Sequence, residues 1–228
     1  REPLSRVREL TADAMSYAWS TIPMVTQYDK ARIDGVEKFR KEFNTKALPE
    51  NKLTMTSFLV KDCAAALRAF PYFNSALDLH SKELVLNHFI NIGVAVDTPA
   101  GLLVPVIHGA DNKGVERIAT ELNTLAEKTR ERRVSPQEME GGTFTISNLG
   151  GIGGSSFTPI VYPPQVAILG VSTAEMMPVW NGKKFVPQLM LPLCLTYDHR
   201  VIDGAAGARF LRWICEALEN PLNMVMKG

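Results

Sequence analysis

The ten residues Leu195–Gly204, LTYDHRVIDG, form the junction on which the prediction of the fold depends. The apolar run before them predicts a buried strand over 189–196, and the spacing after them predicts a helix over 204–218. A histidine at such a junction can project into a cleft from a fixed backbone, and imidazole suits proton abstraction near neutral pH. Asp203, four residues further on, is placed either to order this loop or to orient neighbouring groups. His199 is therefore a candidate general base, although a surface histidine in a charged turn has the same pattern.

A second candidate site is the glycine-rich stretch Gly141–Gly154. A β-prone run, predicted as a strand over 142–147, brings Ser147 and Asn148 to a loop with four glycines in five positions. A hydroxyl there can donate a hydrogen bond to an oxyanion, and glycines let a substrate approach the backbone. The stretch has neither the phosphate-loop pattern GxxxxGK[ST] nor a GxSxG elbow. A flexible structural turn explains the same glycines, so both interpretations stay open.

The remaining patterns predict a single α+β domain, a mixed β-sheet flanked by helices. Apolar residues at helical spacing predict further helices at 4–18, 34–43, 56–70 and 115–132, with Asp34 as the N-cap of the second. Alternating or apolar runs predict strands at 24–33, 85–96, 101–106 and 166–172, with a turn at 97–100. Helices and strands interleave without a regular β-α-β rhythm, which favours a mixed sheet.

The overall composition excludes several classes of protein. The 228 residues carry a formal net charge of +1, whereas a nucleic-acid-binding surface needs a clustered excess of Lys and Arg. No apolar run reaches the roughly 20 residues that cross a bilayer. The first residues contain no hydrophobic segment of the kind found in signal peptides. Neither a nucleic acid nor a membrane is therefore expected as a partner.

Residue types that often bind metals or carry cofactors are interpreted here as structural. The cysteines form no CxxC pair and predict buried thiols: Cys63, Cys194 and Cys215. The remaining histidines match no metal motif, so no metal site is expected: His80, His88 and His108. Asp29-Lys30-Ala31 is similar to the tripeptide that carries lipoyl-lysine, but it lies within a predicted strand and lacks the lipoyl-domain repeat. Lipoylation of Lys30 is therefore rejected.

Six segments, in order over nearly the whole chain, resemble the dihydrolipoamide acyltransferase (E2) family of 2-oxo acid dehydrogenase complexes. They are Pro3–Arg8, Ile22–Gln27, Phe70–Ser75, Gly93–Ile107, Phe144–Gly150 and Asp198–Gly204. The last of them matches the family's HxxxDG signature. Met24 departs from the pattern, because many relatives carry histidine after Ile-Pro. The resemblance implies one catalytic domain over residues 1–228 with the fold of chloramphenicol acetyltransferase.

The resemblance also implies the chemistry. His199 deprotonates the thiol of coenzyme A or of dihydrolipoamide, and Ser147 stabilises the oxyanion that forms when the thiolate attacks the acyl thioester. Asp203 is expected to hold the loop rather than to transfer protons. Positions around the substrate channel of relatives correspond to Asn148, Phe157 and Leu169. No metal takes part, acetyl-CoA is a substrate, and a separate lipoyl domain supplies the lipoyl group.

In this family the active site lies between subunits of a trimer, and trimers assemble into a 24-mer or a 60-mer. The resemblance therefore implies an obligate homotrimer, whose apolar tail Pro221–Met226 either docks into a neighbouring trimer or packs or frays on its own subunit. The chain contains no lipoyl or peripheral subunit-binding domain, so we expect an excised core with these mobile domains before Arg1. The E1 and E3 components are indirect partners. The expected location is the bacterial cytoplasm or the mitochondrial matrix.

The acyl group and the class of protein leave alternatives. Phe144–Gly150 together with Phe157–Ile160 looks most like the acetyltransferases of pyruvate dehydrogenase, so acetyl is expected rather than succinyl or a branched-chain group. One rival is a small-molecule O-acetyltransferase of the same fold, which would ignore dihydrolipoamide and stop at the trimer. The other is a non-catalytic assembly scaffold, and the intact His199, Ser147 and Asp203 count against it.

Overall fold

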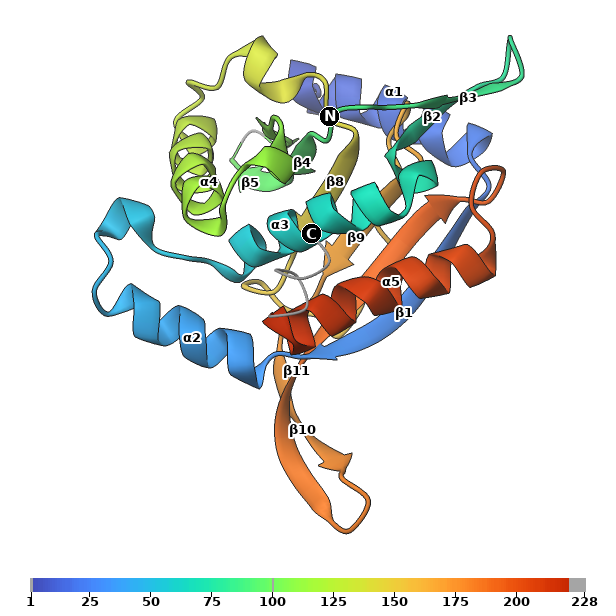
Figure 1. Cartoon of the computed structure of the whole chain (residues 1–228). Coiled ribbons are helices and arrows are strands. Elements are labelled where there is room, and N and C mark those ends of the chain that lie inside the picture. Colours follow the sequence, from blue (N-terminus) through green and yellow to red (C-terminus); the bar gives the residue numbers. More distant parts are fainter. Residues whose placement is uncertain (1, 100, 222–228) are drawn as a thin grey trace.

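A mixed seven-stranded sheet forms the centre of the computed structural model, which describes residues 2–99 and 101–221. Neighbouring strands in it are β1 (Met24–Arg32), β11 (Phe185–Asp198), β9 (Ala167–Val171), β8 (Phe144–Asn148), β4 (Ile92–Val94) and β7 (Val106–Ile107). A seventh strand, β10 (Glu175–Trp180), pairs with β11 and forms a projecting arm (Figure 1). The β4–β8 and β8–β9 pairs are parallel and the other pairs of this sheet are antiparallel, which confirms the predicted mixed sheet.

Two small sheets lie outside the central one. One pairs β2 (Ser75–Asp78) with β3 (Glu83–Leu86), and the other pairs β5 (Val96–Thr98) with β6 (Gly101–Leu103). Short 3-10 helices cover Pro49–Asn51, Pro71–Asn74, Ala110–Asn112 and Pro136–Met139. The small sheets and 3-10 helices connect the main elements. The central sheet positions the candidate site.

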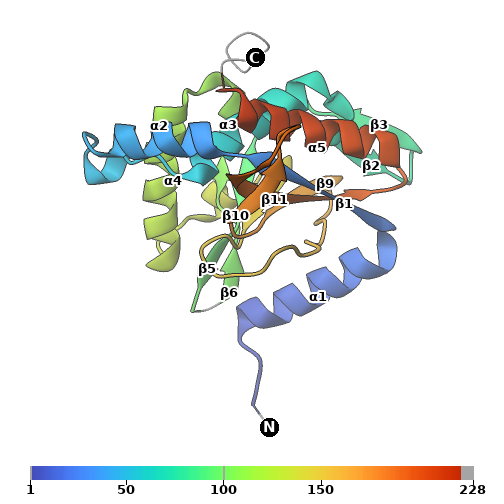
Figure 2. The same cartoon turned by 90° about the horizontal axis from the view of Figure 1, so that it is seen from below.

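Helices lie on both sides of the central sheet (Figure 2). On one side, α3 (Met55–Ala69) packs beside α5 (Gly204–Glu219), with α2 (Asp34–Asn44) next to them and α4 (Val115–Arg130) against α3. On the other side runs α1 (Arg6–Thr21), whose one buried residue is Ala18. The predicted α+β architecture with flanking helices is therefore confirmed.

The apolar core lies between this sheet and the pair α3–α5. The apolar residues that predict the helix over 56–70 are buried in α3, and Thr54 begins this helix by accepting a hydrogen bond from the Ser57 N–H at 3.1 Å. Phe73 stacks on Phe210 of α5, with ring centroids 4.0 Å apart. The Phe210 ring also lies 5.9 Å, centroid to centroid, from the ring of Phe144 in β8, so it ties α5 to the sheet.

The structure corrects three predictions of secondary structure. Asp34 is not the N-cap of α2, because the helix begins at Asp34 itself and its carboxylate accepts a hydrogen bond from the Leu189 N–H at 3.2 Å. The predicted strand 85–96 is broken before β4, where the Asn91 side chain bonds Gly141 and Gly109. The predicted strand 101–106 is broken at 104–105, because Pro105 has no N–H to donate to a ladder. Strand β10 has no counterpart in the sequence prediction, because its residues are largely exposed and include Pro178.

Three further predictions concern the cysteines, Lys30 and the C-terminal tail. The three cysteines are free and buried, as predicted. Burial raises the pKa of the Cys194 thiol to about 11, above its usual range. Lys30 lies inside β1, with its ammonium group 3.8 Å from the Glu175 carboxylate. The predicted tail is Pro221–Met226, and residues 222–226 of it lie outside the described residues, so its docking, packing or fraying stays a prediction.

Candidate active site

Strand β11 carries His199 to the end of the sheet. Asp198, the last residue of the strand, is buried, and His199 directly after it is exposed. The His199 N–H donates to the Pro23 carbonyl at 3.0 Å, and the Asp198 N–H donates to the Val166 carbonyl at 2.8 Å. Among the residues that the structure describes, none forms a hydrogen bond with the imidazole. The histidine is therefore anchored through its backbone, and its ring is free to meet another molecule.

Arg200 folds back past His199 onto Asp198. Its Nη2 donates to Asp198 Oδ2 at 2.6 Å, its Nε donates to Oδ1 at 2.9 Å, and its backbone N–H donates to Oδ1 at 3.0 Å. These bonds raise the pKa of the Arg200 guanidinium above its ordinary value. The buried Asp198 carboxylate and the Arg200 guanidinium that binds it therefore belong to the residues directly before and after the candidate base.

Asp203 closes the same loop by capping α5. Its Oδ1 accepts a hydrogen bond from the Ala206 N–H at 2.7 Å, which satisfies one of the free donors of the first helical turn. Gln27 Nε2 donates to the Gly204 carbonyl at 3.2 Å and ties the end of the loop to β1. No hydrogen bond joins Asp203 to His199 within the described part of the chain. The geometry of Asp203 is that of a residue that orders the loop.

Met24 lies beside this loop. It is the partner of Asp198 in the β1–β11 register, and it packs against a small apolar cluster of Ile22, Val161 and Ile168. The position at which many relatives carry histidine therefore contributes apolar surface next to the candidate base.

Ser147 and Asn148 end strand β8, where the glycine-rich loop begins. Asn148 is held from both sides, because its Nδ2 donates to Thr56 Oγ1 at 3.0 Å and its Oδ1 accepts from the Gly150 N–H at 2.8 Å. A Cβ on Gly150 would approach both Asn148 Oδ1 and the Ser172 carbonyl oxygen to 3.0 Å, so this tight turn needs glycine. The half-buried Ser147 hydroxyl has no hydrogen-bond partner among residues 2–99 and 101–221, and it is therefore available to a ligand.

Phe157 and Leu169 belong to the same end of the sheet as Ser147. Gly170 is the partner of Ser147 in the β8–β9 register, and a Cβ placed on Gly170 would come within 2.9 Å of the Phe157 ring. Leu169 precedes Gly170, pairs with Ile146 and is fully buried in the core. Phe157 therefore packs next to Ser147, whereas Leu169 lies beneath it and supports β8.

The two candidate groups lie at opposite ends of the sheet. Ser147 is in register with Gly170, and Gly170 with Cys194 of β11. His199 lies five residues further along, which is about 16 Å of strand, and two strand spacings add a lateral offset of about 10 Å. The chain therefore brings Ser147, Asn148, Phe157 and Leu169 together and brings His199 and Asp203 together, but it does not bring the two groups to each other.

A cavity of about 270 Å³ opens beside the glycine-rich loop. Asn148 and Gly150 line one side, and Met55, Val171 and Leu191 supply apolar surface. No motif in the sequence marks this cavity, because its lining comes from segments that are far apart in the chain. It enlarges the Ser147 end of the sheet into a concave surface.

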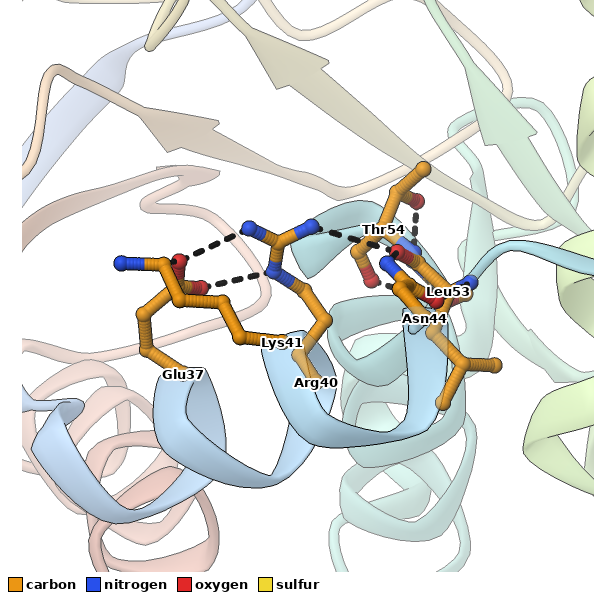
Figure 3. Close-up of polar contacts among 7 residues, drawn as sticks. Glu37, Arg40, Lys41, Asn44, Leu53 and Thr54 are labelled. Carbon is orange, nitrogen blue, oxygen red and sulfur yellow. Dashed lines mark hydrogen bonds and ion pairs between the residues drawn. The ribbon is translucent and has the colours of Figure 1, made fainter. Parts of the chain in front are cut away.

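Glu37 lines the same cavity, and two cations hold its carboxylate. Arg40 donates to the two carboxylate oxygens at 2.7 Å each, and the Lys41 Nζ lies 3.5 Å away (Figure 3). The Arg40 bonds, with a smaller effect of Lys41, lower the pKa of the Glu37 carboxyl below its usual range. The cavity therefore has an apolar interior, and the ion-paired Glu37 carboxylate lies at its wall.

The described residues offer neither a metal-binding cluster nor a membrane-spanning helix. Within residues 2–99 and 101–221, no group of three or more His, Cys, Asp or Glu side chains is arranged to hold a metal ion. No helix in those same ranges has the length and apolar character required to cross a membrane.

Comparison with known proteins gives a consistent set of relatives. A family model described as the 2-oxoacid dehydrogenases acyltransferase (catalytic domain) matches residues 1–226. The chain is 48% identical to the dihydrolipoyllysine-residue acetyltransferase component of the pyruvate dehydrogenase complex of Haemophilus influenzae, over 98% of this chain and 40% of that protein. The same component of Pseudomonas aeruginosa is 49% identical, over 94% of this chain and 40% of that protein. The chain thus spans less than half the length of these curated relatives.

Solved structures agree with this grouping. The cubic core of a pyruvate dehydrogenase multienzyme complex superimposes with a TM-score of 0.95 at 46% identity, covering 99% of this chain and 93% of that chain. The Azotobacter vinelandii dihydrolipoamide acetyltransferase gives the same values. Chloramphenicol acetyltransferase, at 14% identity, covers 91% of this chain and 92% of its own with a TM-score of 0.55, which confirms the shared fold.

The Azotobacter vinelandii structure comes from a study of a serine, a histidine and an asparagine in the catalytic mechanism of that enzyme. Those three residues stand 52 and four positions apart in its chain. Ser147, His199 and Asp203 stand 52 and four positions apart here, with aspartate at the third position.

Proposed function

This chain belongs to the 2-oxoacid dehydrogenase acyltransferase family, and on that premise we propose that it transfers an acetyl group between coenzyme A and dihydrolipoamide. The observation that carries the proposal is the shared spacing of serine and histidine with the Azotobacter vinelandii enzyme, in a chain that superimposes at a TM-score of 0.95. Neither side chain has a hydrogen-bond partner among the described residues, so both are available to a substrate. Acetyl is favoured because the relatives compared above are named acetyltransferases.

The proposed reaction needs one base and one oxyanion donor. His199 takes the proton of the attacking thiol, and the thiolate adds to the carbonyl carbon of the acetyl thioester. The Ser147 hydroxyl donates a hydrogen bond to the oxygen that becomes negative. When the tetrahedral intermediate collapses, the carbon–sulfur bond of the original thioester breaks and the departing thiolate takes the proton back from the imidazolium. A thiol pKa near 8.5 requires only modest help, so a single imidazole suffices.

The reaction requires more than one copy of the chain. Because Ser147 and His199 lie at opposite ends of one sheet, a complete site needs His199 of one copy and Ser147 of another. We infer a homotrimer with three such sites, assembled further into a larger core of 24 or 60 chains. The match to a cubic pyruvate dehydrogenase core supports this assembly.

The remaining partners follow from the same premise. A separate lipoyl domain would carry the dihydrolipoamide arm, and the E1 and E3 components would exchange substrates through it. Asn148 and Phe157, which pack beside Ser147, would border the substrate, with Leu169 supporting them from the core. No metal is needed by this chemistry. The bacterial relatives compared above favour the bacterial cytoplasm over the mitochondrial matrix.

The test is acetyl transfer from acetyl-CoA to dihydrolipoamide by the assembled protein. His199→Ala should lower the rate by about 100- to 10,000-fold, the usual range for a lost general base. Ser147→Ala should lower it by about 100- to 1,000-fold, the usual cost of one oxyanion donor. His80→Ala is the control, because His80 is exposed on the loop between β2 and β3.

Parallel reactions identify the acyl group and the rival functions. Succinyl-CoA should react more slowly than acetyl-CoA, and chloramphenicol should not replace dihydrolipoamide as acceptor. Folded, oligomeric wild-type protein without transfer to dihydrolipoamide would contradict the proposal. Acetylation of a small alcohol would then favour the O-acetyltransferase, and no transfer at all would favour the scaffold.

A further inference from the structure

Hydrogen bonds at several points hold the loop between β11 and α5, and none of them involves the His199 ring. The His199 N–H is bound to Pro23, and the Gly204 carbonyl is bound to Gln27. The Ala206 N–H is bound to Asp203 at the far end of the loop. The Arg200 side chain binds the Asp198 carboxylate and so adds a side-chain contact that spans His199 itself.

We propose that Arg200 is a positioning residue for the transfer reaction. By binding the Asp198 carboxylate across His199, Arg200 fixes the backbone from which the imidazole projects. The inference rests on the proposed function, because it assigns a role within the same site. Arg200 acts on His199 through the backbone and does not need to touch the substrate.

The Arg200 guanidinium binds the Asp198 carboxylate through two of its nitrogen atoms, and this fork fixes the orientation of both groups. Asp198 Oδ1 accepts from both the backbone N–H and the Nε of Arg200, so the carboxylate and the arginine close a ring over the intervening residue. The Asp198 side chain is only 3% exposed, and the Asp198 carbonyl accepts from the Val201 and Ile202 N–H groups at 3.0 Å each. Rotation of the Asp198 carboxylate would therefore break its bonds to Arg200, whereas the bonds of the Asp198 carbonyl would remain and hold the turn through the backbone.

Arginine is suited to this role in a way that lysine is not. A planar guanidinium binds two carboxylate oxygens at fixed angles, whereas an ammonium group is a point charge on a flexible stem. The imidazole has to meet a thiol and a Ser147 from another copy, and a displacement of about 1 Å in such a constellation lowers the rate by up to about 100-fold. Loss of the fork should therefore act on kcat, even where the charge is kept.

The experiment compares Arg200→Lys with Arg212→Lys in the assembled protein. Arg212 is a matched control, because it also forms ion pairs with carboxylates, at 3.0 Å to Asp29 and 2.8 Å to Glu219. The two arginine side chains are similarly exposed, at 30% and 38%. We expect kcat of Arg200→Lys to fall about 10- to 100-fold with little change in either KM, and Arg212→Lys to keep the wild-type kcat.

A second variant and a second readout separate positioning from folding. Asp198→Asn combined with Arg200→Gln removes both charges, so no unpaired carboxylate is left buried, and it should show the same loss of kcat. Crystal structures of wild type and Arg200→Lys measure the displacement of the His199 ring, whether or not the protein transfers acetyl groups. An unmoved ring with wild-type kcat would overturn the inference, and so would a raised KM for acetyl-CoA at unchanged kcat, which would make Arg200 a substrate ligand. Inactive wild-type protein would contradict the proposed function alone.

Discussion

Gly207 of α5 lies against the ring of Tyr197 in β11: a Cβ placed on Gly207 would come within 2.6 Å of the Tyr197 Cε1. The ring is fully buried, and its pKa is raised above the ordinary value by burial, with a smaller effect of the Asp203 charge. The helix that follows the His199 loop can approach the sheet this closely only because it carries glycine at that position.

Gly207→Ala should therefore destabilise the protein by about 1–3 kcal/mol, because the added methyl group has no space beside the ring. Gly35→Ala is the control, since nothing lies within 4 Å of a Cβ at this helical position. The control should change stability by less than about 1 kcal/mol, in the stabilising direction. Urea unfolding monitored by circular dichroism measures both. Equal midpoints would contradict the close contact between α5 and β11.

Asn44 holds the segment that enters α3, and Asn44→Ala should release it. Its side chain accepts from the Leu53 N–H at 2.8 Å and donates to the Leu53 carbonyl at 2.9 Å (Figure 3). Removal leaves polar backbone groups of a buried residue without this partner, which costs about 1–3 kcal/mol. Thr45→Ala, which loses one exposed bond to the Glu42 carbonyl, should cost less than about 0.5 kcal/mol. Denaturant midpoints that rank the two variants in the reverse order would be incompatible with this contact.

The three thiols should be unreactive in the folded protein. Cys63 and Cys215 are fully buried, and Cys194 is 1% exposed. Burial also raises the pKa of each thiol, so the reactive thiolate is scarce. Treatment with a thiol-specific chromogenic reagent should label none of them at pH 8 and all three after unfolding in guanidinium. Rapid labelling of native protein would show that the core opens easily.

Glu138 should make stability depend on pH in the acid range. Its hydrogen bond with Lys128, followed by those with Ser135, lowers the carboxyl pKa from 4.5 to about 2. A depressed pKa in the folded state means that this stabilisation is complete above about pH 4.5 and is lost as the pH falls towards 2. Glu138→Gln should therefore differ from wild type near pH 6 and converge with it near pH 2.

The control for this experiment is Glu140→Gln, because Glu140 forms no hydrogen bond or ion pair with the described residues. Unfolding free energies measured at several pH values should show a constant difference from wild type for this variant. A constant difference for Glu138→Gln as well would contradict the lowered pKa.

Elements with one buried face could be predicted from the sequence, and elements without one could not. The helix predicted at 56–70 is α3, Met55–Ala69, because its apolar stripe packs on the sheet. Strand β10 could not be found, because its residues are held by backbone pairing with β11 and contribute no buried side to the pattern. Asn91 shows the other limit, since it breaks a predicted strand through bonds to Gly109 and Gly141, which are distant in sequence.

The same limit applies to the site. Its residue types could be predicted, since His199 directly follows a strand and Ser147 lies at the end of one, before the glycine-rich loop. Their separation could not, because it depends on which strands are parallel. Strand β8 runs parallel to β9 and β11 runs antiparallel to it, so the carboxyl ends of β8 and β11 point in opposite directions.

This division of the site between the two ends of the sheet has a genetic consequence. If each site combines His199 of one copy with Ser147 of the next, a chain lacking only the histidine and a chain lacking only the serine have complementary defects. In trimers formed from an equal mixture of the two, about a quarter of the interfaces would contain both intact residues. Two alleles that are each inactive alone would then restore activity when expressed together, whereas two alleles defective in the same residue would not.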